Sequence, residues 1–191
     1  MRDMDRLVAA SLGLILVACG SAPHVARSQG SVTRTRSAPG DGQAQVADRR
    51  MATILEAHNR VRSPHCAAPL AWSDALATHA QGWADHLAAD GCRLVHSGHA
   101  YGENLAAGTA GTLSPEGVVE LWSREVASYD HGTGGFSMEA GHYTQVVWTS
   151  SERLGCGVAQ CGGLEIWVCN YDPPGNYEGQ FQTHVLPTSC R

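Results

Sequence analysis

The amino-acid sequence predicts an α+β domain in which helices pack against an antiparallel sheet. Three segments with apolar residues at helical spacing come first, and segments with strand-like alternation follow only after residue 140. This order indicates a layered α+β arrangement, because a doubly wound fold alternates strands and helices along its length. We therefore expect one folded domain, preceded by a segment that does not belong to it.

The first 18 residues are predicted to be an export signal. The apolar run from Leu7 to Ala18 is too short to span a bilayer and has the length of a secretory signal core. It ends in LVAC, followed by Gly20, which resembles a bacterial lipoprotein signal. Residues 1–18 would then be removed as a lipoprotein signal peptide, and Cys19 would carry the lipid. An ordinary secretory signal, in which Cys19 is incidental, is the alternative.

Residues 19–47 are predicted to be a disordered tether. They are dominated by small and polar residues, which cannot bury enough apolar surface to fold. Through lipidated Cys19 the tether would attach the domain, residues 48–191, to a membrane. Gly20 after the cysteine favours the outer membrane if the host has two membranes. Either signal predicts an exported protein, in the cell envelope or extracellular.

The predicted domain is acidic. Residues 48–191 contain eight arginines and fifteen acidic residues, and the whole chain contains no lysine, so this part carries a net charge of about −7. Proteins that bind nucleic acid present a basic surface. We therefore expect no nucleic-acid partner.

The first predicted helix covers residues 48–62. His58 lies on its apolar face, and we interpret His58 and Asn59 as core residues that hydrogen-bond neighbouring backbone, in preference to catalytic residues. The apolar face repeats at helical spacing, through Met51, Ile54, Leu55, His58 and Val61.

Two further helices are predicted. The second begins after Ser73, a good N-cap, and runs to Asp90. The third begins at Ser114 and Pro115, because proline is tolerated in the first turn of a helix. Glu125 would lie on the apolar face of this third helix. A carboxylate in that position needs either a partner or contact with water.

Strands are predicted from Gly141 onward, where side chains of His142 and its alternate neighbours would point to one face. The segments LGCGVAQC and LEIWVCNY flank Gly162 and Gly163, which indicates a hairpin. The Pro-Pro-Gly-Asn segment at 173–176 then ends the sheet.

Six cysteines of the predicted domain are expected to form disulfide bonds, because the protein is predicted to be exported. Their spacing alone permits 15 pairings. A cysteine zinc site is disfavoured, since the chain has no C-x-x-C pair. The six are Cys66, Cys92, Cys156, Cys161, Cys169 and Cys190.

Four motifs make the chain resemble the CAP superfamily, the cysteine-rich secretory, antigen 5 and plant pathogenesis-related group-one proteins with an SCP-like domain. One of them lies within CRLVHSGHAYGENLA at 92–106, a segment that places His96 and Glu103 in a glycine-bordered loop. The motifs are HNRVR at 58–62, GENL at 102–105, GHYTQVVWTSS at 141–151 and IWVCNYDPPGNY at 166–177. The two long motifs, in this order, carry most of the resemblance.

The resemblance implies a three-layer α-β-α sandwich with a central antiparallel sheet, crossed by the Pro-Pro-Gly-Asn segment as an ordered strap. It also implies a central cleft that holds two histidines and two glutamates. In this sequence those positions are His96, Glu103, Glu125 and His142.

The resemblance also bears on the disulfides. Many plant members have a cysteine directly before Gly-His-Tyr-Thr-Gln, where this chain has Ala140, so the usual partner of Cys92 is missing and Cys66 is expected to replace it. Reflection of the hairpin about its two glycines places Cys156 opposite Cys169. The predicted pairs are Cys66–Cys92, Cys156–Cys169 and, by elimination, Cys161–Cys190.

The four cleft residues permit more than one chemistry. His96 and His142 are candidate ligands of a divalent metal, zinc above all, with Glu103 and Glu125 in supporting roles. The same side chains could form a metal-free polar cluster. The two glutamates could also act as acid and base. No nucleophile follows from the sequence, since Ser97 is only adjacent to His96 along the chain.

Three functions therefore remain open. The first is a non-enzymatic, membrane-tethered module whose cleft binds a divalent metal, a lipid, a glycan or a protein; lipid and metal binding enter by resemblance to the family. The second is a secreted, protease-like hydrolase that uses the His and Glu residues. The third is a structural surface domain whose cleft has no present role. We favour the first.

Overall fold

The computed structural model describes residues 41–189, with side chains from residue 45. The predicted signal peptide (1–18), the lipidation site Cys19, most of the predicted tether and Cys190 lie outside the described residues. Within the described range, no helix is both long enough and apolar enough to cross a membrane.

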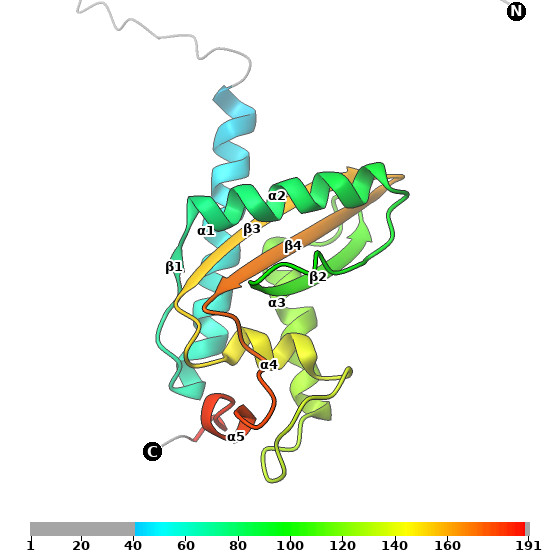
Figure 1. The fold of residues 1–191 in the computed structure, drawn as a ribbon. Helices are drawn as coiled ribbons and strands as arrows, with labels where there is room; N and C mark the ends of the chain where they lie inside the picture. Colours follow the sequence, from blue (N-terminus) through cyan, green and yellow to red (C-terminus); the bar gives the residue numbers. More distant parts are fainter. Residues whose placement is uncertain (1–40, 190–191) are drawn as a thin grey trace, which may run out of the picture. The chain divides into compact units, whose positions relative to one another are not determined.

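Helices come first along the chain and the central hairpin comes late (Figure 1). Two 3-10 helices, η1 (Ser63–His65) and η2 (Arg124–Ser128), follow α1 and α3. The other elements are α1 (Asp41–Arg62), β1 (Ala71–Trp72), α2 (Asp74–Ala89), β2 (Gly102–Thr109), α3 (Pro115–Ser123), α4 (Gly141–Val147), β3 (Arg153–Cys161), β4 (Leu164–Asp172) and α5 (Phe181–His184).

The four strands form one sheet in the order β1-β3-β4-β2. β4 pairs antiparallel with both of its neighbours, as the predicted hairpin requires, whereas β1 pairs parallel with β3 through two residues. α2 covers one face of the sheet, and α1, α3 and α4 lie on the other side (Figure 1). These three layers are the predicted α+β sandwich.

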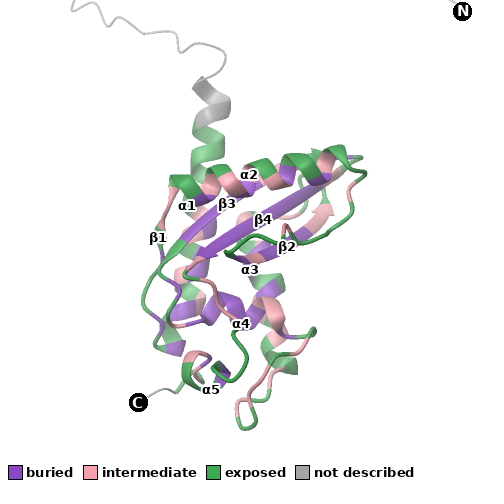
Figure 2. Ribbon diagram, viewed as in Figure 1, coloured by how far each residue is buried: buried purple, intermediate pink, exposed green. Residues whose placement is uncertain are grey.

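The two faces of β4 supply two separate apolar cores. Ile166 and Val168 pack in the cluster that contains α2, while Trp167 and Cys169 belong to the larger cluster with α1, α3 and α4. Consecutive residues of a strand point to opposite faces, so this is the pattern of a strand that is covered on both sides. Figure 2 shows β3 and β4 buried along most of their length.

Two glycines allow α2 to lie directly on β3. A Cβ atom at Gly155 would collide with the backbone of Leu76 and Ala77, and one at Gly157 would collide with the backbone of Gln81. Glycine in a strand often marks such a close approach of another backbone.

The predicted starts of two helices are confirmed. Ser73 caps α2 by accepting a hydrogen bond from the backbone N–H of Leu76, and Ser114 caps α3 in the same way. The first helix was predicted too short, because α1 begins at Asp41, inside the predicted tether. Val46, in the added turns, is exposed. Periodicity of apolar residues cannot reveal such turns.

The predicted strand from Gly141 is wrong, because this segment forms α4. All residues from Tyr143 to Trp148 are buried (Figure 2). The segment therefore has no solvent-exposed face, and the alternation of apolar and polar residues along it does not indicate a strand. The Glu125 carboxylate accepts hydrogen bonds from the backbone N–H groups of His142 and Tyr143, at 3.0 and 3.1 Å. Glu125 thereby supplies acceptors for two backbone N–H groups in the first turn of α4, which have no partner within the helix.

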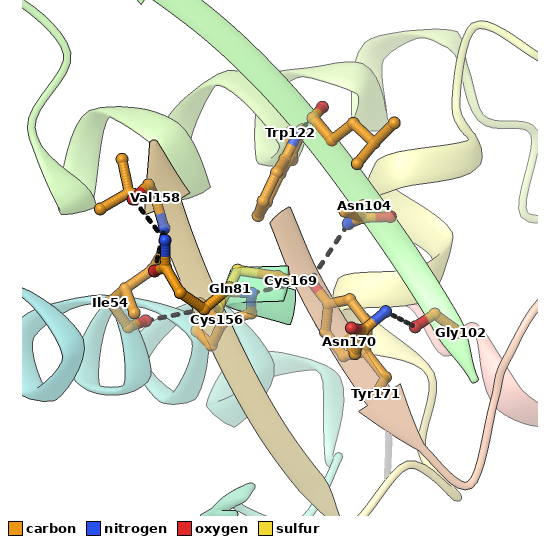
Figure 3. The surroundings of a disulfide bond; sticks show 12 residues. Ile54, Gln81, Gly102, Asn104, Trp122, Cys156, Val158, Cys169, Asn170 and Tyr171 are labelled. Atoms are coloured by element: carbon orange, nitrogen blue, oxygen red, sulfur yellow. Dashed lines mark hydrogen bonds between the residues drawn. A yellow bond between two sulfur atoms is a disulfide. The ribbon is translucent and has the colours of Figure 1, made fainter. Parts of the chain in front are cut away.

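The hairpin disulfide is as predicted, and the other two predicted pairs are wrong. Cys156 and Cys169 face each other in the β3–β4 register and are bonded (Figure 3). Cys92 bonds to Cys161, with Cα atoms 5.8 Å apart, which excludes both Cys66–Cys92 and Cys161–Cys190. Cys66 is disulfide-bonded too.

The length of α2 explains why Cys92 does not bond to Cys66. Cys66 lies before this helix and Cys92 just after it, and a helix of 16 residues separates its two ends by about 24 Å. Because α2 lies along β3, its C-terminal end brings Cys92 to the hairpin end of β3, where Cys161 is located.

Candidate functional site

His96 and Glu103 form the first of two histidine–glutamate pairs. His96 lies in the loop after α2, and its Nδ1 atom is 2.8 Å from Glu103 Oε1. Glu103 is in β2 and not in the loop where the sequence placed it; it also accepts the backbone N–H of Ser97 at 3.0 Å. The His96 side chain is 64% exposed and that of Glu103 is 6% exposed. A buried carboxylate therefore holds an accessible imidazole.

Hydrogen bonding shifts both pKa values of this pair toward the charged forms. The bond to Glu103 raises the pKa of His96 above its ordinary value. Burial by itself would raise the pKa of Glu103, but the hydrogen bonds from His96 and Ser97 together outweigh burial and lower it. The other carboxylate oxygen, Glu103 Oε2, is buried without a hydrogen-bond partner. An additional donor or a cation would stabilise it there.

His142 and Glu125 form the second pair. His142 Nδ1 is 2.6 Å from Oε1 of Glu125, which lies in η2 directly after α3. The indole ring of Trp122 stacks on the His142 ring, with centroids 6.1 Å apart and an interplanar angle of 18°. The side chain of His142 is 33% exposed. This imidazole is therefore fixed by a carboxylate and an aromatic ring but still reaches solvent.

A buried chain of hydrogen bonds ties β2 to α4 and α1. The side-chain amide of Asn104 donates to the carbonyl oxygen of His142 at 3.0 Å and to the hydroxyl of Tyr171 at 3.1 Å. The Tyr171 hydroxyl in turn lies 2.8 Å from Nε2 of His58, whose Nδ1 contacts the Ile54 carbonyl oxygen at 2.7 Å. Asn104 directly follows the glutamate of the first pair, so this chain connects the two pairs through the strand.

His58 is a core residue, as its sequence position predicted. It is fully buried, and burial lowers its pKa to about 4, so the imidazole is neutral at physiological pH. Asn59 also bonds backbone as expected, through both the N–H and the carbonyl of Leu70. Neither residue reaches the exposed imidazoles by a hydrogen bond among the described residues.

Arg62 anchors the C-terminal end of α4. Its guanidinium is completely buried and donates to the carbonyl oxygens of Val146 and Trp148, at 2.8 and 2.9 Å, and of Ser151 and Ala68, both at 2.9 Å. Burial lowers the pKa of Arg62 to about 10, so the group is still charged at neutral pH. The last carbonyls of a helix lack intrahelical donors, and Arg62 supplies them.

Gln145 of α4 connects the strap to the start of β2. Its Oε1 atom accepts the backbone N–H of Gly175 at 2.9 Å. A Cβ atom at Gly102 or Gly175 would collide with the Gln145 amide, so a larger residue at either position would displace this side chain. Asn176 adds a hydrogen bond of 2.7 Å from the Thr144 hydroxyl. The strap is thus an ordered segment held by α4.

Sequence reasoning missed several residues that build this site. Asn104, Tyr171, Arg62 and Gln145 position the histidine–glutamate pairs, yet none had been singled out. The signal was available, because each lies inside one of the four motifs. Motif residues that are neither titratable near neutral pH nor apolar are the ones that secure the backbone.

The two pairs supply oriented imidazoles. Each ring bonds its carboxylate through Nδ1, which leaves Nε2 as the atom that can bind a metal or exchange a proton. In the described part of the chain, no group of three or more His, Cys, Asp or Glu side chains is placed to hold a metal ion. The predicted ligands His96 and His142 are thus present as separate, anchored donors.

Comparison with known proteins identifies relatives. The family model described as the cysteine-rich secretory protein family, CAP, matches residues 55–171. Pathogenesis-related protein 1A of Nicotiana tabacum is 48% identical over 129 residues, which cover 66% of this chain and 76% of that protein. Protein PRY2 of Saccharomyces cerevisiae is 44% identical over 138 residues, covering 71% of this chain and 40% of that protein.

Solved structures share the fold at lower sequence identity. Venom allergen-like protein 4 of Schistosoma mansoni aligns with a TM-score of 0.53 and 24% identity, over 70% of this chain and 97% of that chain. The crystal structure of NaASP2 with Zn2+ aligns with a TM-score of 0.58 and 24% identity, over 72% of this chain and 87% of that one. These likenesses concern the fold.

Proposed function

Because the chain belongs to the cysteine-rich secretory protein family, we propose that it is an exported binding protein whose two histidine–glutamate pairs hold a divalent metal ion and form its ligand site. The matched family is described as secretory, which supports export. The observation that carries the proposal is the pairing itself, since each exposed imidazole is held through Nδ1 by a less exposed carboxylate.

The donor types, imidazole and carboxylate, are those that zinc prefers. Neutral imidazole is a common ligand of zinc, and a carboxylate on the other ring nitrogen is the usual means of orienting such a ligand. His96 and His142 would bind the ion through Nε2, with Glu103 and Glu125 as their anchors. The buried, unpartnered Oε2 atom of Glu103 favours a cation nearby. When bound, zinc would polarise or hold an oxygen or nitrogen group of the ligand, which would be a lipid, a glycan or a protein.

Export and tethering complete the proposed function. Two disulfides, Cys92–Cys161 and Cys156–Cys169, support an oxidising compartment outside the cytosol. The signal at residues 1–18 and the lipid on Cys19 would place the domain on the cell envelope, so a membrane is its proposed partner. Mass spectrometry of the mature N-terminus tests the anchor, and an unmodified Cys19 would contradict it.

A hydrolase gains no support from the described residues. The Ser97 hydroxyl accepts the backbone N–H of His99 and has no hydrogen bond to His96. A serine nucleophile is usually activated by an imidazole within hydrogen-bond reach. We therefore favour binding over hydrolysis.

Calorimetric titration of the full chain with zinc tests the metal site. We expect one site whose affinity falls by about tenfold or more when the pH drops from about 7.5 to about 5.5, because imidazole ligands must be deprotonated. The double variant His96→Ala, His142→Ala should lose the site, while His86→Ala, which removes an exposed histidine of α2, should retain it. Zinc binding that survives loss of both histidines would contradict the proposal.

A further inference from the structure

One edge of β3 lacks a partner strand over most of its length. β4 pairs with all of β3 on one side, but β1 pairs with it only at Arg153 and Leu154 on the other. No strand in the described part of the chain pairs with this second edge from Cys156 to Cys161. Such an edge presents backbone N–H and C=O groups that can pair with another chain.

The side chain of Gln81 occupies the middle of this edge. Its Nε2 atom donates to the Val158 carbonyl oxygen, and its Oε1 atom accepts the Val158 N–H, both at 3.0 Å (Figure 3). This two-bond pattern is the one that a residue of a neighbouring antiparallel strand would make through its own N–H and C=O groups. Backbone groups that face one edge recur at every second residue, so those of Cys156 and Gln160 point to the same side as those of Val158.

A groove of about 890 Å³ follows this edge between α1 and α2. Met51, Ala52 and Leu55 of α1 form one wall, Ala77 and Gly82 of α2 belong to the other, and Val158 lies at the bottom. The α2 wall extends from Asp74 to Asp85, which is about 16 Å of helix and the length of about five extended residues. The groove therefore accommodates one short strand.

The charges that line the groove select the occupant. Asp48, Asp74 and Asp85 are among the lining residues, and none of the lining residues is basic. The α1 wall is mostly apolar, while the α2 wall carries two of the three carboxylates. Alternate side chains of an added strand would face these two walls in turn.

We propose that this groove binds an extended peptide of a partner protein as a fifth strand on β3, with alternating apolar and basic side chains. The apolar residues would face α1 and the basic residues would face Asp74 and Asp85. The Gln81 amide would rotate away and yield its two hydrogen bonds to the peptide backbone. A second copy of this chain fits less well, because α1 and α2 flank the edge in both copies.

Calorimetry with the full chain and the blocked peptide acetyl-Val-Arg-Val-Arg-Val-amide tests the proposal. We expect binding in the micromolar to sub-millimolar range, a free energy of about −5 to −8 kcal/mol. Two N-methylated versions distinguish strand addition from apolar contact, since only one set of backbone N–H groups faces β3. Methylation of either the valines or the arginines should weaken binding by about tenfold, and methylation of the other set should leave it within about twofold.

Variants of the groove complete the test. Gln81→Ala should tighten peptide binding, because the competing amide is gone. Asp74→Asn with Asp85→Asn should weaken it, while Asp90→Asn, at the exposed C-cap of α2 and outside the groove, should not. On peptide binding, amide exchange at Cys156 and Gln160 should slow. Absence of binding, equal loss from both methylated sets, or a dimer that forms through this edge would overturn the proposal.

Discussion

The side-chain amide of Asn104 donates to the main-chain carbonyl oxygen of His142 at 3.0 Å. The two residues belong to different motifs and to different elements, β2 and α4, and Asn104 is next to the glutamate that holds His96. This hydrogen bond therefore fixes the position of one histidine–glutamate pair relative to the other.

We predict that Asn104→Asp destabilises the protein by about 2–4 kcal/mol, because a buried carboxylate would face the His142 carbonyl oxygen and leave it without a donor. Chemical denaturation under non-reducing conditions measures the change. Asn59→Asp, which loses the hydrogen bond to the Leu70 carbonyl oxygen and has no hydrogen bond to the pairs among the described residues, is the control for zinc affinity. Equal zinc affinity in wild type and Asn104→Asp would show that this bond does not position the site.

The pH dependence of stability should report His58. Its pKa falls from 6.5 to about 4 on folding, because it is buried. Above about pH 6.5 this residue does not reduce the free energy of unfolding. As the pH falls from about 6.5 to about 4, the free energy of unfolding should drop by about 3 kcal/mol, since only the unfolded chain takes up the proton. The non-titrating variant His58→Gln should lack this part of the decline. Parallel pH profiles for the two proteins would contradict the prediction.

Two glycine substitutions should have opposite effects. Gly157→Ala places a Cβ atom against the backbone of Gln81 and should destabilise the protein by about 1–3 kcal/mol. Gly82→Ala lies within α2 with open space around its Cβ position, and should stabilise it by about 0.5–1 kcal/mol. Thermal unfolding of both variants shows whether one melting temperature falls and the other rises. Destabilisation by Gly82→Ala would mean that α2 packs differently.

Peptide mapping without reduction should find Cys92 joined to Cys161 and Cys156 joined to Cys169. Replacement of both cysteines of a pair by serine should cost about 4 kcal/mol for Cys92–Cys161 and about 3 kcal/mol for Cys156–Cys169, because sequence separations of 69 and 13 close loops of different length. Mild reductant should open Cys92–Cys161 first, since Cys156 and Cys169 are both buried. A peptide that contains Cys66 and Cys92 would refute this pairing.

The sequence predicted elements well where a local signal decides them. Ser73 and Ser114 are caps that act within one turn, and the paired glycines at 162–163 close a hairpin whose strands pair directly. The sequence-based prediction failed at Gly141–Val147. This segment is packed on nearly all sides by other elements, and Glu125 caps it from a different helix. No local pattern could report that hydrogen bond.

The sequence predicted the titratable residues of the candidate site but not the residues that hold them in position. His96, Glu103, Glu125 and His142 were identified by resemblance, and the structure pairs them two by two. Their partners within each pair, and the role of Asn104, depend on where β2 and α4 lie, which spacing along the chain does not give. The same limit explains the disulfides, since the course of α2 along β3 decides the partner of Cys92.

The hydrogen bonds of Arg62 restrict the order in which parts of the chain can reach their native positions. This arginine ends α1, yet three of the carbonyl oxygens it binds lie 84, 86 and 89 residues later. Contacts so distant in sequence close slowly, because the intervening loop must lose its entropy first. While the chain emerges from a ribosome or a translocation pore, this guanidinium stays in water. The first helix can therefore dock in its native place only after residue 151 has emerged, late in the chain.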